Sequence, residues 1–419
     1  MKTKTDTKSL GVPSVVSFDE AWHFIVKVGL AFHRYGSTAG RLEFFLRQLS
    51  EKFGYEGVFK STPSEIIFGL RETPNSPQRL EFITTPGSGV DLDKLAQLGD
   101  LLTEFDAGHL SLDDFHARLN SIDKTPPPWG PFATLLSYAI VGAGLAPLLG
   151  GGWADSIFAT LFSILVYGVV VVSGRLGPVA SSWLPFSSAF IVGVLATVVK
   201  LWVPELNLVL VILSAVAIII PGYTISLGVG ELVGQHIASG IANLMAGLIC
   251  LSKQVLGGWF GIIVVSKVFP MVTSEPSVPV AQIWMWLFVP LILIGLCLAF
   301  QTSRRDLLWA VLVSGIAYLG IMLGSVFLNT NLGNLLGTIF AVVLANLWAE
   351  KTGRPGLIVL IPAIVLLVSG SIGFRGLIAM VDGNLLLGVE QFLQMFVVAL
   401  TIFVGIIIGY TISRPNRWL

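Results

Sequence analysis

The sequence has few charged residues and almost no cysteine. Asp, Glu, Lys and Arg make up 12% of the 419 residues and balance to a formal net charge of zero. Because no basic tract is present either, the composition argues against nucleic acid as a partner. The two cysteines, Cys250 and Cys297, lie in apolar runs, so a disulfide framework is not expected. The first 20 residues lack the apolar core of a signal peptide, and we expect the N-terminal part to stay on the side of synthesis.

Motifs of catalysis and cofactor binding are also missing. Four histidines near the N-terminus could suggest a metal site: His23, His33, His109 and His116. No H-E-x-x-H, Cys/His, G-x-S-x-G or Walker spacing accompanies them, so we expect no metal and no other cofactor. The chain is interpreted as a non-enzyme, and any transport by it should not use ATP.

Hydrophobic residues and glycine dominate instead. Hydrophobic residues make up 54% of the chain and glycine occurs 45 times, while the mean hydropathy is +0.82. These values are typical of a polytopic membrane protein. Ten runs are long enough to cross roughly 30 Å of hydrocarbon, and they lie near 131–150, 154–173, 184–200, 207–225, 237–261, 281–300, 307–324, 333–349, 355–374 and 390–410.

The stretch 211–261 joins two apolar runs through a segment that cannot be a plain helix. Pro221 lacks an N–H group and clashes with the preceding turn, and the glycines after it make a continued helix costly. At membrane depth such broken backbone survives only where it is buried or lines a cavity. We therefore predict a substrate site at this break, beside a polar cluster of Glu231, Gln235, His236, Ser239 and Asn243.

The second half of the chain repeats this pattern. Moving 211–261 forward by 148 positions places it on 359–409 and aligns Gly222 with Gly370, Gly228 with Gly376, Gly240 with Gly388, Gly257 with Gly405 and Gly261 with Gly409. The last two pairs form G-x-x-x-G spacings, which allow helices to approach closely. Ten spans then divide into two repeats of five. An odd number per repeat predicts that the halves are inverted relative to each other, as in many secondary transporters.

Residues 18–128 have ordinary soluble composition. Their periodicity predicts helices and short strands, so we interpret them as a soluble cytoplasmic α+β domain. The membrane part is predicted to contain one five-helix repeat in 129–265 and a second in 281–412. The predicted fold is thus an α-helical polytopic membrane protein with ten transmembrane helices in two five-helix inverted repeats and a small soluble N-terminal domain.

Four segments of the chain resemble the threonine/serine exporter family. They are GSTAGRLE at 36–43, IIPGYTISLGVGEL, SGIANL and RPGLIVLIPAIVLLVSGSIGFRG, and the resemblance covers nearly the whole chain. It implies a membrane exporter of threonine or serine. The chain departs from the family at two places, since family members often have arginine at the position of Asn243 and Pro-Gly at Ser369-Gly370.

The breaks and the residues near them supply the candidate site. An α-carboxylate could bind the backbone N–H groups of a helix that starts beyond Pro221. Glu231 is expected to couple protons or to bind the ammonium group, because an ionisable residue at membrane depth is costly. Further proton-coupling candidates are Asp155 and Asp382. The predicted substrate-binding residues are Pro221, Gly222, Tyr223, Thr224, Asn243, Ser369, Gly370 and Arg375.

These candidates also have purely structural interpretations. Pro221 could form a packing kink, and Glu231 could be a loop carboxylate at the membrane interface. Lys253 could pair with Glu231 or Asp155 if its helix continues to Val265, or extend its amine to the interface if the helix ends early.

The remaining charged candidates lie at the ends of predicted spans. Asp155 and Asp306 begin corresponding spans, where a carboxylate stabilises a helix N-terminus. Arg375 and Asp382 flank the second break and could meet the substrate or lie in an outer loop.

The leading functional hypothesis is a secondary exporter of threonine or serine in the cytoplasmic membrane, driven by the proton gradient. Its partners would be the small-molecule substrate, protons and the lipid bilayer, and a homo-oligomer is left open. Alternatives are an exporter of a small dicarboxylate, or a membrane-anchored hydrolase or sensor that acts through the N-terminal domain. A passive channel would not need two inverted halves with broken helices.

Charge asymmetry predicts the topology, with both termini cytoplasmic. Under this orientation the outer segments hold only Lys200, Lys267 and Arg375, whereas the inner loops and C-terminus hold Arg175, Arg304, Arg305, Lys351, Arg354, Arg414 and Arg417. This distribution satisfies the positive-inside rule.

We therefore expect a membrane-impermeant thiol reagent applied from outside to label cysteines placed at Glu205 and Pro276. The same reagent should not reach cysteines placed at Arg304 and Lys351 unless the membrane is permeabilised. Labelling at Arg304 in intact cells would contradict the topology and with it the inverted repeat.

Overall fold

The chain forms two compact units in the computed structural model, which describes residues 16–85, 89–270, 275–327, 332–367 and 370–413. One unit contains the residues up to Pro127 together with Asn346–Ile358, and the other contains Pro128–Ala345 and Val359–Arg414. The N-terminal unit therefore includes a short segment from far along the chain, which the sequence analysis did not predict.

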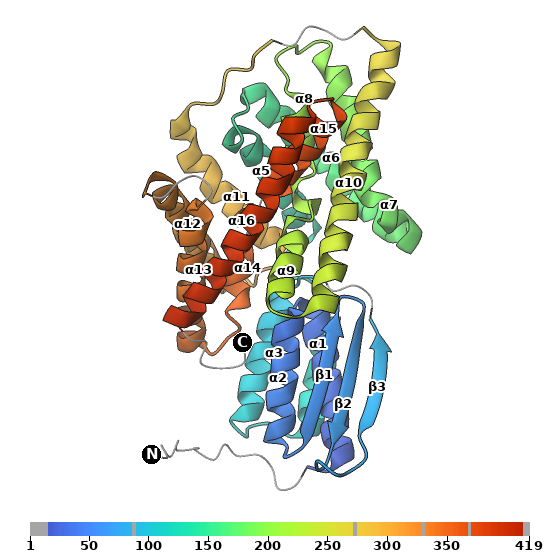
Figure 1. Cartoon of the computed structure of the whole chain (residues 1–419), viewed down its shortest axis with the longest axis vertical. Coiled ribbons are helices and arrows are strands. Elements are labelled where there is room, and N and C mark those ends of the chain that lie inside the picture. The colour runs from blue at the N-terminus through green and yellow to red at the C-terminus, as the bar shows by residue number, and fades with distance from the viewer. Residues whose placement is uncertain (1–15, 86–88, 271–274, 328–331, 368–369, 414–419) are drawn as a thin grey trace. The chain divides into compact units, whose positions relative to one another are not determined.

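The N-terminal unit packs helices against one face of a three-stranded antiparallel sheet, as Figure 1 shows. Strand β2 is central, and its residues Ile66, Phe68 and Leu70 are fully buried. The predicted α+β character is confirmed. The elements are α1 (Phe18–Tyr35), α2 (Ala39–Lys52), β1 (Glu56–Thr62), β2 (Glu65–Arg71), β3 (Arg79–Thr84), α3 (Leu92–Asp106) and α4 (Leu112–Lys124).

Local sequence determines where α1 starts and ends. Ser17 caps its first turn, since the hydroxyl accepts from the Glu20 N–H at 3.3 Å and the Glu20 carboxylate accepts from the Ser17 N–H at 2.9 Å. This reciprocal pair is a capping box. Gly36 ends the helix with a φ of 106°, a left-handed conformation that glycine adopts without strain.

The membrane unit consists of helices, nine of which are long and apolar enough to cross a membrane in the described residues. A tenth span is obtained if the bent pair Leu208–Ala215 and Ala217–Val233 is counted as one. The ten predicted spans therefore correspond to observed helices. These are α5 (Pro131–Leu148), α6 (Trp153–Leu176), α7 (Pro178–Lys200), α8 (Leu208–Ala215), α9 (Gly222–Val233), α10 (Ile237–Val268), α11 (Met285–Ala299), α12 (Leu307–Phe327), α13 (Gly333–Thr352), α14 (Leu357–Leu367), α15 (Gly370–Val381) and α16 (Leu385–Ile412).

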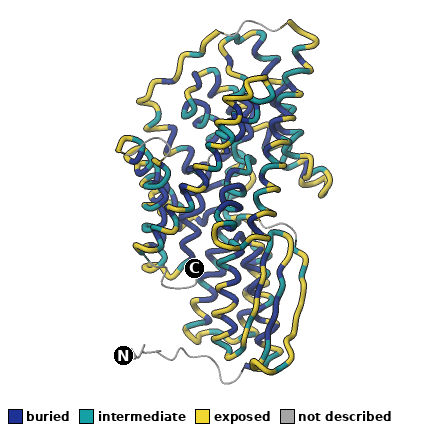
Figure 2. The backbone as a smooth tube through the Cα atoms, in the orientation of Figure 1, coloured by how far each residue is buried: buried dark blue, intermediate teal, exposed yellow. Residues whose placement is uncertain are grey.

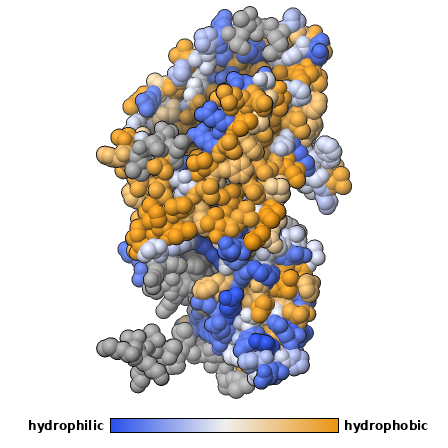
Figure 3. Space-filling model, viewed as in Figure 1, coloured by the Kyte–Doolittle hydropathy of each residue, from blue (hydrophilic) through white to orange (hydrophobic). Residues whose placement is uncertain are grey.

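Exposed apolar side chains cover the outside of this unit. Figure 3 shows a broad hydrophobic surface over its helices, and Leu161, Val264 and Ile407 are each about half exposed. Polar groups and glycines gather on the buried faces instead. Figure 2 shows the same division along the backbone, with buried residues toward the middle of the unit. This pattern, apolar outside and packed inside, is the one expected of helices surrounded by lipid.

Matching glycines bring matching helices together in the two halves. A Cβ atom on Gly261 of α10 would lie 2.5 Å from the Phe190 carbonyl oxygen of α7. A Cβ on Gly409 of α16 would lie 2.7 Å from the Val342 Cβ of α13. Because these distances are too short for any side chain, both G-x-x-x-G pairs serve to pack the last helix of each half on the third.

Two further glycine pairs close the turn between the short helix and the long helix of each half. A Cβ on Gly228 would lie 2.9 Å from the Gly240 carbonyl oxygen, and a Cβ on Gly376 would lie 2.9 Å from the Gly388 carbonyl oxygen. All four glycines belong to the repeat found in the sequence. The short helices α9 and α15 therefore cross α10 and α16 at backbone contact distance.

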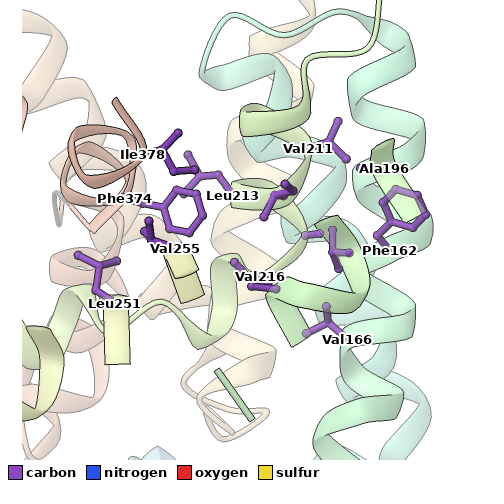
Figure 4. Packing of buried hydrophobic residues seen from close by; sticks show 14 of the residues in the cluster. Phe162, Val166, Ala196, Val211, Leu213, Val216, Leu251, Val255, Phe374 and Ile378 are labelled. Carbon is purple, nitrogen blue, oxygen red and sulfur yellow. The ribbon is translucent and has the colours of Figure 1, made fainter. Parts of the chain in front are cut away.

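One apolar core joins elements from both halves. Figure 4 shows Phe374 and Ile378 of α15 beside Leu213 of α8 and Val255 of α10. Each of these side chains is at most 5% exposed. The short helix of the second half is thus packed directly on the first half.

The glycine contacts predict a difference in stability between two similar substitutions. Gly257→Ala would press a methyl group against the Phe186 carbonyl oxygen, and we expect it to destabilise the protein by about 1–3 kcal/mol. Gly168→Ala in α6 meets nothing within 4 Å and should be neutral or stabilising by up to about 1 kcal/mol. Unfolding in detergent measures both, and equal stability of the two variants would contradict the packing role of Gly257.

Candidate functional site

The predicted break in 211–225 is present. Helix α8 ends at Ala215, a single 3₁₀ turn covers Ala217–Ile219, and α9 begins at Gly222 after Pro221. The two arms of this pair are bent by 65°. The predicted residues Tyr223 and Thr224 lie in the first turn of α9 and are half-buried. The first N–H groups of a helix have no partner within it, so they carry partial positive charge.

Gly370, the glycine predicted to lie at the second break, packs against Gly222 of the first break. Helix α15 begins at Gly370, and a Cβ on this glycine would lie 3.0 Å from the Gly222 Cα and 3.4 Å from its nitrogen. The N-termini of α9 and α15 therefore converge, and both ends are positive by the helix dipole. Ser369, the other predicted residue of the second break, lies outside the described residues.

Gln254 of α10 is a buried polar residue beside the first break that sequence reasoning missed. Its amide nitrogen donates to the Ile219 carbonyl at 2.9 Å, which fixes the orientation of the amide. Its Oε1 atom is buried and has no partner in the described part of the chain, and the same is true of Ser214 Oγ in α8 and Ser226 Oγ in α9. Buried polar atoms without partners are rare, and a bound ligand or water explains them. The sequence feature that could have revealed this residue is a single glutamine within an apolar run, on the side of α10 that faces away from the lipid.

Glu231 lies in the last turn of α9, where Ser239 and Asn243 of α10 surround it. Its carboxylate accepts from the Ser239 hydroxyl at 2.7 Å and from the Asn243 amide at 2.8 Å, and its exposed fraction is 6%. Glu231 is therefore a buried helical residue and not a loop carboxylate. A helix rises by about 1.5 Å per residue, which places Glu231 about 14 Å from Gly222. Asn243 consequently lies with Glu231 and not with the break.

Asp155 caps a helix and connects two others. It is fully buried, and its carboxylate accepts from the Gly152 N–H at 2.9 Å and from the Asn207 N–H at 2.7 Å. The first bond caps α6, and the second holds the start of α8. Asp306, at the start of α12, is 2% exposed and accepts from the Ser303 hydroxyl at 2.9 Å. The structural interpretation of both carboxylates is therefore supported.

Arg375 lies inside α15, so the alternative that it lies in a loop is excluded. The helix that starts at Gly370 continues to Val381, which places Arg375 in its second turn. Its side chain is half-buried, and its Nε atom has no partner among the described residues. Asp382 directly follows the last residue of α15. Arg375 is thus close to the meeting point of the breaks along the chain, and Asp382 is at the far end of the helix.

Lys253 pairs with neither predicted carboxylate. Helix α10 continues to Val268, beyond the Val265 that this pairing required. The Lys253 amine nevertheless donates to the Ser182 carbonyl of α7 at 3.0 Å. Of the two alternatives for this helix, the longer one is observed, and Lys253 contacts a neighbouring backbone instead of a carboxylate.

The N-terminal unit contains no cluster of three or more metal-binding side chains in the part of the chain that the structure describes. His33 is buried with its Nε2 atom 2.8 Å from the Thr62 carbonyl oxygen, and burial lowers the pKa of this imidazole. A shallow pocket of about 260 Å³ lies between α3 and α4, where Arg118 and Glu104 pair at 2.5 Å. Its lining includes neither histidine nor cysteine.

Two family models match the chain. One, described as "Putative threonine/serine exporter", matches residues 23–265, and "Threonine/Serine exporter, ThrE" matches residues 285–412. The "Probable threonine/serine exporter" of Mycobacterium tuberculosis is 22% identical, over 86% of this chain and 70% of that protein. No solved structure matches.

Fungal relatives match as well. An uncharacterized protein of Schizosaccharomyces pombe is 21% identical, over 86% of this chain and 45% of its own length. Pheromone-regulated membrane protein 10 of Yarrowia lipolytica is 21% identical, over 87% of this chain and 31% of its own length. The chain thus spans less than half the length of these two relatives.

The broken spans, their buried polar groups and the apolar exterior define a multi-span α-helical membrane protein of the transporter class. The family models cover most of its length. The chain belongs to the threonine/serine exporter family.

The contact of Gln254 with the break predicts a stability effect. Gln254→Leu leaves the part-buried Ile219 carbonyl without its donor, so we expect a loss of about 1–2 kcal/mol in unfolding free energy. Ser252→Ala, at an exposed position of the same helix, is the control and should change stability by less than about 0.5 kcal/mol. Denaturant unfolding in detergent measures both. Parent stability in Gln254→Leu would mean that this bond does not hold the break.

Proposed function

We propose that this protein is a secondary exporter of a small polar amino acid, threonine or serine, across the cytoplasmic membrane. The observation that carries this proposal is the approach of Gly370 to Gly222, which brings two helix N-termini together. Free N–H groups and aligned dipoles at such ends favour an anion. An α-carboxylate between α9 and α15 fits this charge, and half-helices at a membrane break bind carboxylates in this way.

The unpartnered oxygens near the first break fit the remaining groups of the substrate. An ammonium group has three donors and no acceptor. Gln254 Oε1, Ser214 Oγ and Ser226 Oγ are buried acceptors without partners among the described residues. We infer that some of these oxygens accept from the substrate ammonium or hydroxyl group. A purely apolar substrate would leave them unsatisfied, which is costly in a buried site.

We infer that 129–265 and 281–412 form two inverted repeats. Five aligned glycines occupy equivalent packing positions, and the two break glycines contact each other as residues near a twofold axis would. With the N-terminal domain in the cytoplasm, this arrangement supports alternating access around a central site. The two converging helix ends would then come from opposite halves.

Glu231 is proposed as the proton-coupling residue. Its carboxylate is buried and accepts from the Ser239 hydroxyl and the Asn243 amide, and such hydrogen bonds stabilise the charged form of a carboxylate. Glu231 is distant from the break, so the proposed proton site differs from the proposed site for the substrate carboxylate. Loss or gain of a proton at the end of α9 would act on the substrate through that helix.

An exporter of a small dicarboxylate is a second candidate. Arg375 favours it, because its half-buried Nε atom has no partner among the described residues. A second carboxylate would need such a cation. Malate and succinate therefore belong in the substrate panel.

The test uses proteoliposomes loaded with threonine, with and without a proton gradient. Glu231→Gln keeps the shape of the side chain but cannot exchange a proton, so gradient-driven export should fall to background while threonine exchange persists. Glu205→Gln makes the same change at an exposed position and should export at the parent rate.

Gradient-driven export by Glu231→Gln at the parent rate would rule out its coupling role. If the parent protein exports dicarboxylates but neither threonine nor serine, the substrate assignment fails instead.

A further inference from the structure

The N-terminal unit binds the loop between α13 and α14. Three contacts from one face of α3 reach residues 353–355. Arg354 Nε donates to Asp100 Oδ1 at 2.8 Å, and the Thr103 hydroxyl lies 3.4 Å from the Gly353 carbonyl oxygen. Pro355 lies against Gly99 so closely that a Cβ atom on this glycine would overlap the proline ring. An ion pair and a close packing contact therefore coincide, while the Thr103 hydroxyl donates its proton within α3, to the Gly99 carbonyl at 2.9 Å.

The ion pair is better protected from water than the Arg118–Glu104 pair of the same helix. The side chains of Arg354 and Asp100 are 18% and 33% exposed, whereas those of Arg118 and Glu104 are 55% and 48% exposed. Partial burial reduces screening by water and salt, so the first pair should contribute more to stability than a typical surface pair.

Backbone geometry makes the loop short and rigid. Gly353 has a φ of +73°, a left-handed conformation that favours glycine and ends α13. Pro355 is buried and its carbonyl accepts from the Ile358 N–H at 3.1 Å, at the start of α14. Only Gly356 separates Pro355 from the first residue of α14. A displacement of this loop would therefore also displace the first residues of α14.

The helix that follows is the most enclosed span. In the span Leu357–Val381, 75% of the residues in its most apolar window are buried, against 28–44% in the other spans. This span contains Gly370, which packs against Gly222 of the first break. The loop held by α3 thus begins the span that reaches the predicted substrate site.

We propose that α3 of the soluble domain is a brace that holds the loop 353–355 and thereby positions α14 and the second break. Asp100 and Arg354 are positioning residues in this role, and Gly99 is the socket for Pro355. This gives the soluble domain a mechanical function in the transport cycle, beyond the substrate site itself.

A charge exchange tests the ion pair in the full-length protein in detergent. Lys351 is exposed three residues before Arg354, so cleavage by a lysine-specific protease reports on the loop. Asp100→Arg and Arg354→Asp should each accelerate cleavage at Lys351 by at least fivefold, and the double exchange should restore most of the protection. Glu104→Gln, which breaks the other pair of α3, should leave cleavage at the parent rate.

Gly99→Ala tests the contact with Pro355. Its methyl group would displace the proline, and the higher helix propensity of alanine offsets this cost only in part, so the melting temperature should fall as it does in Gly257→Ala. We expect accelerated cleavage at Lys351 and a threonine export rate several-fold lower, with unchanged KM. Gly257→Ala is the control for stability and should leave cleavage at Lys351 at the parent rate.

Three outcomes would overturn the brace. If Asp100→Arg and Arg354→Asp are both cleaved at the parent rate, the ion pair does not hold the loop. The same conclusion follows if the double exchange does not restore protection. Accelerated cleavage with a parent export rate in Gly99→Ala would show that the contact does not position α14. The protease assay needs no substrate, so its result is independent of which molecule the protein exports.

Discussion

Lipid provides no hydrogen-bond partners, and this constraint explains most of the membrane unit. A break in a helix is tolerated only where other protein covers the freed backbone groups. Here the cover comes from close backbone contact at glycines, such as Gly228 with Gly240 and Gly376 with Gly388. Gln254 adds a donor to the Ile219 carbonyl within the break. Glycine thus allows backbones to approach closely beside the broken helix as well as between unbroken ones, such as α7 and α10 at Gly261.

The same contacts create polarity in the middle of an apolar structure. Helices α9 and α15 begin where Gly222 and Gly370 meet, so their N–H groups are gathered without any charged side chain. A dipole end is a weaker anion site than an arginine, which suits a substrate that must be released in every cycle. The polar atoms left without partners, in Ser214, Ser226 and Gln254, are consistent with a site that is complete only when occupied.

Predictions from local pattern were confirmed where one element determines the outcome. The interruption at Pro221 and the ten apolar runs depend on neighbouring residues only. Alternatives stayed open where a side chain has several targets within reach. Lys253 contacts a backbone carbonyl instead of a carboxylate, and Arg375 lies in a helix instead of a loop. Spacing along the chain does not distinguish these cases, because a long side chain can reach several groups at similar cost.

The sequence by itself determined the membrane class, the α+β character of the N-terminal unit, the position of the first break and the aligned glycines, because hydropathy, periodicity and backbone restriction are local properties. Only the tertiary structure decided which residues share a site. It separated Glu231 and Asn243 from the break, added Gln254, and placed Arg354 beside Asp100, 254 positions away along the chain. Such pairings depend on how helices cross, and helix crossing is decided by packing between segments that are far apart in the sequence.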